Sequence, residues 1–261
     1  MSAADTQASV RAAAARRTPS LAAALVLALA GAAWLSLAVW GVSPARRYLS
    51  HEQLAHRLDW ITAGALVGGW LLMIVAMMLP TITPLVRLFA RVVQSKPARR
   101  RLFAFLVLGY LAVWLGFGLL AEVGDLNLHR LVDADPWLES HHWLVAVSVF
   151  ASAGCYQFSA LKYRCLDRCR LPMGFIERRW SGGNEARQAL RIGIDHGFSC
   201  MGCCWTLMLV MFSLGMGSIG WMLALAAVMA AEKNLTWGRR LSTPVGVTLV
   251  SVAAVMAAAH L

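Results

Sequence analysis

The amino-acid sequence contains long runs of apolar residues separated by short polar connectors. A helix that crosses a bilayer needs about 20 mostly apolar residues, because the hydrocarbon core is about 30 Å thick. Four runs approach or exceed this length, at residues 21–42, 61–79, 102–121 and 143–161. This feature restricts the fold more than any other, since it predicts a membrane protein built from helices.

The composition excludes the other broad classes of protein. Apolar residues make up 59% of the chain and charged residues 14%, with a mean hydropathy of +0.61. Soluble domains carry about 25% charged residues, so this chain could not cover its surface with polar groups. Disordered chains have low hydrophobicity, which is the opposite of what is observed.

A fifth apolar block, residues 198–231, is too long for one span and is interrupted by glycines at 215, 217 and 220. We interpret it as a tight hairpin of two spans, residues 198–214 and 218–231. A last span is expected at residues 244–259. The predicted fold is therefore an all-α, polytopic helical bundle with about seven transmembrane helices.

The domain organisation is simple. A basic head, residues 1–18, precedes a single membrane-embedded helical domain, residues 19–261. The apolar run after the head is longer than the core of a signal peptide, so we expect a retained anchor. The longest polar connector, residues 162–197, contains cysteines and is predicted to be cytoplasmic.

The distribution of basic residues predicts the orientation. With seven spans, 20 of the 24 Lys and Arg residues fall on one side of the membrane. Such asymmetry follows the positive-inside rule and predicts a cytoplasmic N-terminus. The net charge of +11 is therefore interpreted as a topological signal rather than a sign of nucleic-acid binding.

Five of the six cysteines are predicted to gather at the cytoplasmic side. Cys165 and Cys169 follow the fourth span, and Cys200, Cys203 and Cys204 begin the fifth. Cytoplasmic thiols are normally kept reduced, so these side chains are predicted to be thiols or thiolates rather than disulfides. The sixth cysteine, at position 155, lies inside the fourth span, where packing as a small apolar residue is favoured.

The spacing of these cysteines fits a metal site. Residues three or four positions apart share a helix face, which applies to Cys165 with Cys169 and to Cys200 with Cys203. Two such pairs on neighbouring helices could offer four soft donors to one ion, while Cys204 exchanges with one of them. Simple packing of the thiols, or a structural zinc clamp between two helices, are the alternatives.

Methionines at the inner end of the second span extend this donor set. Met73 and Met77 share a helix face, and Met78 follows directly. Thioether and thiolate donors together favour Cu(I), because soft ligands select a soft ion. The alternative is that these methionines only fill gaps in an apolar core.

Further polar residues are secondary candidates. Asp195 and His196 precede the fifth span, and Glu232 ends the sixth at the same face. Six of the seven histidines are predicted on the outer side, where a solvated acidic loop is favoured over a metal site. These histidines are His51, His56, His129, His141, His142 and His260.

Four segments of the chain together resemble a known bacterial family of predicted metal-binding integral membrane proteins. The segments are AMMLPTITPL, GYLAVWLGFGLLA, AGCYQFSALKYRCLDRCRLP and DHGFSCMGCCWTLMLVMFSLGMGSIGWMLALAAVMAAEKN, which begin at Ala76, Gly109, Ala153 and Asp195. The likeness covers residues 61–234. It implies a multi-pass protein of the bacterial inner membrane that serves as a copper chaperone for tyrosinase-type oxidases.

The resemblance also implies a set of metal-binding positions. These are Met77, Met78, Cys165, Cys169, Cys200, Cys203 and Cys204. Two local departures from the family pattern are Ala160 and the segment 235–237, where prolines would be expected.

The sequence therefore predicts binding and transfer of a soft transition metal, Cu(I), at the cytoplasmic side of the membrane. Expected partners are the lipid bilayer and a copper-dependent oxidase or a soluble metallochaperone, with no nucleic acid. No nucleotide-binding, zinc-protease or hydrolase motif is present, so no catalytic activity is expected. The alternatives are a membrane thiol–disulfide oxidoreductase and a membrane scaffold held by a structural zinc ion.

Overall fold

The computed structural model describes residues 21–43, 60–214 and 218–260, and within these residues the chain is helical without any strand. The predicted basic head and the outer histidines at positions 51 and 56 lie outside the described residues. The principal helices are α2 (Leu21–Val42), α3 (Trp60–Met77), α4 (Thr83–Val92), α5 (Arg99–Ala134), α6 (Pro136–Ser140), α7 (Trp143–Tyr156), α8 (Ala160–Arg170), α9 (Met173–Arg179), α10 (Glu185–Leu214), α11 (Ile219–Asn234) and α12 (Ser242–Ala258). Two 3₁₀ helices, η3 (Leu79–Ile82) and η4 (Gly238–Leu241), precede α4 and α12.

The described helices support between four and six membrane spans. Four are long and apolar enough to cross a bilayer: α2, α5, most of α10, and η4 with α12. Two bent pairs, α3 with α4 and α7 with α8, add two more if each pair forms one span. Helix α11 has 16 residues, which is short for a span. The seven spans and the cytoplasmic N-terminus therefore stay predictions.

Several helices extend beyond the apolar runs that predict them. Helix α5 has 36 residues, and it continues to Ala134 after the apolar run at residues 102–121 ends. No proline or glycine pair interrupts this polar extension, and Pro136 begins the next helix. Loss of hydrophobicity does not by itself end a helix, because many polar residues are good helix formers.

The predicted polar connector, residues 162–197, is also largely helical. It contains most of α8, all of α9 and the first turns of α10. Pro172 follows α8, and Gly182 and Gly183 separate α9 from α10 with positive φ angles of 84° and 101°. These residues, and not the polarity of the segment, set the breaks between its helices.

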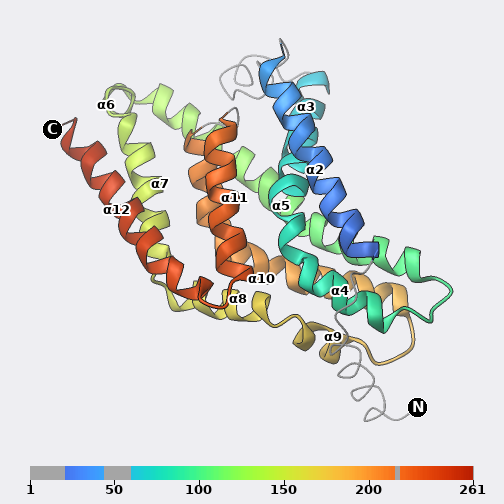
Figure 1. The fold of residues 1–261 in the computed structure, drawn as a ribbon. Coiled ribbons are helices and arrows are strands. Elements are labelled where there is room, and N and C mark those ends of the chain that lie inside the picture. The colour runs from blue at the N-terminus through green and yellow to red at the C-terminus, as the bar shows by residue number, and fades with distance from the viewer. Residues whose placement is uncertain (1–20, 44–59, 215–217, 261) are drawn as a thin grey trace.

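The predicted fourth span, residues 143–161, is broken rather than straight. Helices α7 and α8 meet at an angle of 64°. Ser159 caps the new helix by accepting a hydrogen bond from the Lys162 backbone N–H at 3.1 Å. The bend directs α8 across the end of the bundle, where it contacts both α10 and α11 (Figure 1).

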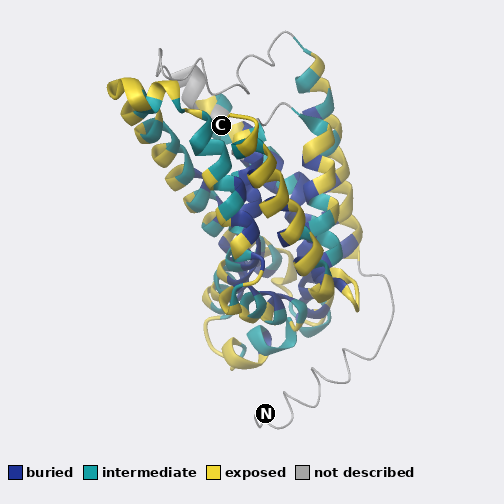
Figure 2. Ribbon diagram, turned by 90° about the vertical axis from the view of Figure 1, so that its left-hand side faces the viewer, coloured by how far each residue is buried: buried dark blue, intermediate teal, exposed yellow. Residues whose placement is uncertain are grey.

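The core lies where α10 crosses its neighbours. Helix α10 contacts α5, α7, α8 and α11, and buried residues concentrate along the centre of the bundle (Figure 2). On the outer faces of the peripheral helices, large apolar side chains are exposed, among them Leu25, Leu35, Leu120 and Val255. An apolar outer surface of this kind suits a lipid environment.

Candidate metal centre

Helix α10 presents four candidate donors along one face. His196, Cys200, Cys203 and Cys204 are spaced by four, three and one residues, so they fall on adjoining positions of two helical turns. All four side chains are at least 97% buried. The thiols of Cys203 and Cys204 both donate hydrogen bonds to the Cys200 carbonyl, each at 3.0 Å.

Helix α8 brings the second cysteine pair onto this face. The buried Cys169 thiol lies close to Cys200 and Cys203. Cys165 packs against α10 at Gly202, where an added Cβ would lie 2.6 Å from the Cys165 sulfur. The two cysteine groups that are distant in sequence therefore meet at the α8–α10 contact, although Cys165 lies at its edge.

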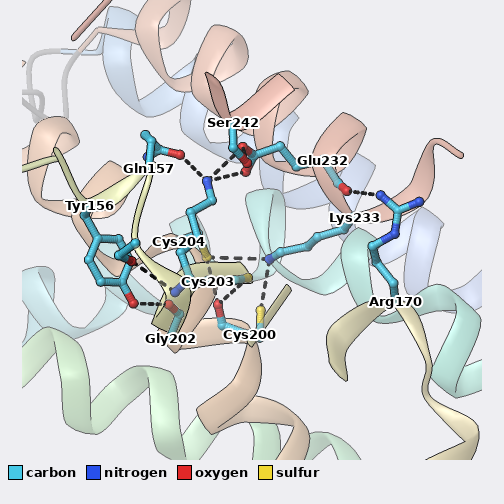
Figure 3. A network of polar contacts seen from close by, with 12 residues as sticks. Tyr156, Gln157, Arg170, Cys200, Gly202, Cys203, Cys204, Glu232, Lys233 and Ser242 are labelled. Atoms are coloured by element: carbon cyan, nitrogen blue, oxygen red, sulfur yellow. Dashed lines mark hydrogen bonds and ion pairs between the residues drawn. The ribbon is translucent and has the colours of Figure 1, made fainter. Parts of the chain in front are cut away.

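A lysine from α11 enters the same cluster. The Lys233 Nζ lies 3.0 Å from the Cys200 sulfur and 3.5 Å from the Cys204 sulfur. It also lies 3.8 Å from the thioether sulfur of Met78. Figure 3 shows the lysine side chain extending from α11 toward the cysteines. Three sulfur atoms thus share one cationic neighbour in the protein interior.

Two aromatic side chains close the cluster on another side. The Tyr110 hydroxyl, from α5, donates to the Met78 carbonyl at 3.1 Å and lies 3.1 Å from the Cys200 sulfur. The His196 ring lies against Tyr110, with ring centroids 6.0 Å apart. Its Nδ1 atom is buried and has no hydrogen-bond partner, so His196 retains an unused nitrogen on this face of α10.

A buried polar network fixes the end of α11 that carries Lys233. Lys162, on α8, pairs with both Glu232 carboxylate oxygens at 2.8 and 2.9 Å and also donates to Gln157. Ser242, at the start of α12, donates to the same carboxylate at 2.7 Å. Arg170 donates to the Glu232 backbone carbonyl at 2.9 Å. Figure 3 shows Glu232 directed to these partners and Lys233 to the cysteines.

The three methionines predicted as donors occupy different places. Met78 lies at the end of α3, as the N-cap residue of η3, and contacts Lys233. Met73 and Met77 are buried in the apolar core, and the structure records no polar contact between them and the cysteines. The Met78 backbone is still helical and its N–H donates to the Ile74 carbonyl, so Met78 lies about 100° around the helix from Met77 and off the face shared by Met73 and Met77.

No ready-made metal site, built from cysteines or from harder donors, is present in the described part of the chain. Within it, no group of three or more His, Cys, Asp or Glu side chains is arranged to hold a metal ion. His129, His141 and His142 instead approach backbone carbonyls of their own segments at 2.7–3.1 Å. Cys155 is exposed on α7, so the expected packing of this residue in the core is wrong.

An open cavity of about 840 Å³ lies at the junction of α8, α9 and α10. Its lining includes Arg168 and Ser199, which directly precede Cys169 and Cys200 in the chain. Arg178 and Arg179 also line it, and Arg179 pairs with Asp195 at 2.7 Å. The cavity therefore offers an arginine-rich surface next to the helices that carry the cysteines.

Sequence reasoning missed Tyr110 and Lys233, which contact the sulfurs, and the role of Lys162, which pairs with Glu232. Tyr110 and Lys233 were not singled out, and Lys162 was counted only as a basic residue of a connector. The available signal was the Glu232–Lys233 pair, since ionisable residues at the end of an apolar helix often have a functional partner. Their partners could not be identified, because they come from helices far away in the sequence.

Comparison with models of known protein families gives a match. A family model described as PpoB2, copper chaperone, matches residues 67–256, which include every residue of the cluster. No curated protein and no solved structure matches the chain.

Proposed function

The chain belongs to the PpoB2 copper chaperone family, and from this premise we propose that it binds Cu(I) through its buried sulfur cluster and transfers the ion at the cytoplasmic face of the bacterial inner membrane. The recipient in this proposal is a copper-dependent oxidase. The family name supports the role of copper and of such a partner. The ion's oxidation state, the side of the membrane and the ligands are the parts that we propose.

One observation carries the proposal. The sulfur atoms of Cys200, Cys204 and Met78 lie around a single cationic group at 3.0–3.8 Å, in a site that excludes solvent. Three sulfur atoms that gather in one buried place supply the soft donors that a soft metal ion needs, with the lysine as their neighbour. Cys203 and Cys169 lie close enough to replace one of these donors during transfer.

The donor chemistry favours Cu(I) over harder ions. Thiolate and thioether groups are soft ligands and select Cu(I), whereas carboxylate and carbonyl oxygens suit Mg²⁺ or Ca²⁺. Glu232, a buried carboxylate near the cluster, is already engaged by Lys162 and Ser242. Asp195, another carboxylate near the cysteines, pairs with Arg179.

Transfer requires only that ligands are exchanged, so we propose that the protein catalyses no covalent reaction. The arginine-lined cavity between α8, α9 and α10 is the proposed place where a soluble metallochaperone approaches the cysteines. All six cysteines are free thiols. No observation therefore favours the alternative thiol–disulfide oxidoreductase.

The test is a titration of the purified, reduced protein in detergent with Cu(I), in competition with a chromophoric Cu(I) chelator. The wild-type protein is expected to withdraw copper from the chelator, and the Cys200→Ser/Cys204→Ser variant to lose this ability. Cys155→Ser serves as the matched control, because Cys155 is exposed on α7 and outside the cluster. Equal copper binding by the wild type and the double variant would refute the proposal.

A further inference from the structure

The Lys233 ammonium is an unusual neighbour for a metal site. It is 93% buried, and its polar contacts are the sulfur atoms of Cys200, Cys204 and Met78. Coulombic repulsion disfavours a metal cation beside an ammonium unless anionic ligands lie between them. The presence of Lys233 among these sulfurs therefore needs an explanation within the proposed function.

The neighbouring carboxylate does not neutralise this lysine. Glu232 precedes Lys233 in the chain, but its side chain pairs with Lys162 and accepts a hydrogen bond from Ser242. Lys162 and Glu232 thus form a separate pair without net charge. Any charge that balances Lys233 comes from the cysteine sulfurs that it contacts.

Charge balance then distinguishes metal ions by their valence. A cysteine that binds a metal does so as a thiolate, after releasing its proton. Two thiolates, from Cys200 and Cys204, together with the Lys233 ammonium carry a net charge of minus one. A monovalent ion brings this buried group to neutrality, whereas a divalent ion leaves an excess positive charge. An uncompensated charge is costly in a site that excludes water.

We propose that Lys233 sets the preference of the sulfur site for a monovalent ion such as Cu(I) over a divalent ion such as Zn(II). This inference rests on the proposed function, because it assigns a selectivity residue to the same metal site. It also explains why a lysine, which cannot bind a metal as an ammonium, is held beside the donors. The network of Lys162, Glu232, Ser242 and Arg170 keeps the lysine there by fixing the end of α11.

The experiment compares the affinities of Cu(I) and Zn(II) for each protein, using competition with a chelator for each metal. Lys233→Gln removes the charge, and Lys233→Arg retains it. In Lys233→Gln, two thiolates with Zn(II) form a neutral group, so zinc binding is expected to strengthen relative to copper. The ratio of Cu(I) to Zn(II) affinity should fall by about 100-fold, the order expected for one uncompensated buried charge.

The outcomes separate this inference from the proposed function. If the wild type binds Cu(I) but the ratio is unchanged in Lys233→Gln, or falls equally in Lys233→Arg, the lysine does not act through its charge and the inference is wrong. If the wild type binds no Cu(I), the proposed function itself fails. Lys233→Leu is the second neutral variant, because it also removes the charge and keeps a side chain of similar volume. Either neutral variant that folds is expected to show the same shift.

Discussion

At the scale of single residues, the buried pair of Lys162 and Glu232 is the strongest constraint on the site. Their side chains are 0% and 2% exposed and lie 2.8 Å apart. Taking two charges out of water is costly, and only good geometry with additional hydrogen bonds offsets this cost. Gln157 and Ser242 supply those additional bonds. The pair therefore joins α8, α11 and the start of α12 at one point.

Glu232→Gln is expected to destabilise the protein by about 3 kcal/mol, because it leaves the Lys162 ammonium buried without a counter-charge. The measurement is denaturant unfolding in mild detergent, followed by circular dichroism. The double variant Lys162→Met/Glu232→Leu removes both charges and is expected to recover most of the lost stability. A double variant that is as unstable as Glu232→Gln would show that the hydrogen-bond network matters more than the charge balance.

At the scale of secondary-structure elements, the contact between α5 and α10 depends on glycine. A Cβ at Gly193 would overlap the Leu106 carbonyl oxygen, and a Cβ at Gly109 would overlap the Leu190 carbonyl oxygen. The two backbones therefore approach closely, as is common where small residues line helix contacts in membranes. This contact places Tyr110, one residue after Gly109, beside Cys200.

Gly193→Ala is expected to destabilise the protein by about 1–3 kcal/mol, since the added methyl group forces two helix backbones apart. Gly116→Ala is the matched control on α5, because nothing lies within 4 Å of its added Cβ. The control is expected to be neutral or to gain up to about 1 kcal/mol, as alanine favours helix over glycine. Thermal unfolding in detergent measures both. Equal melting temperatures for the two variants would contradict the close contact.

The sequence predicted the existence of the helices better than their ends. Hydrophobic length identified helices near residues 21–42, 61–79 and 244–259, because apolar runs of that length have few alternative structures. It missed the polar extension of α5, the helices of the connector and the 64° bend after Tyr156. These features depend on capping, on proline and glycine positions and on tertiary contacts, none of which changes the hydropathy profile.

At the scale of the whole molecule, the site is assembled from helices that are distant in the sequence. The spacing of Cys200, Cys203 and Cys204 predicted a shared face, since helix periodicity is a local property. The prediction that Cys169 and Met78 lie near these cysteines followed from placing all of their segments at the same end of the bundle. The contributions of Tyr110 and Lys233 depend on how α5 and α11 rotate about their axes, which the sequence pattern does not determine.

The orientation of the whole molecule determines which compartment the sulfur cluster faces, and the charges at its two ends provide the test. Helix α9, with Arg178 and Arg179, and helix α6, with Glu139, lie at opposite ends of the bundle (Figure 1). The segment of α7 and α8 connects them. By the positive-inside rule, α9 is expected in the cytoplasm and α6 outside.

Exposed reporter cysteines can check this expectation in cells, in a Cys155→Ser background. Ser140→Cys, on α6, is expected to react with a membrane-impermeant maleimide added to cells whose outer membrane has been made permeable. Arg178→Cys, on α9, is expected to react only in inverted vesicles. Both native side chains are exposed. Labelling of both positions from one side would mean that α7 and α8 do not cross the membrane together. Labelling of Arg178→Cys from outside would place the sulfur cluster at the outer face of the membrane, and the proposed transfer would then begin from a different compartment. Because the two reporters flank this one segment, the result tests its crossing directly and does not depend on whether α3 and α4 also form a span.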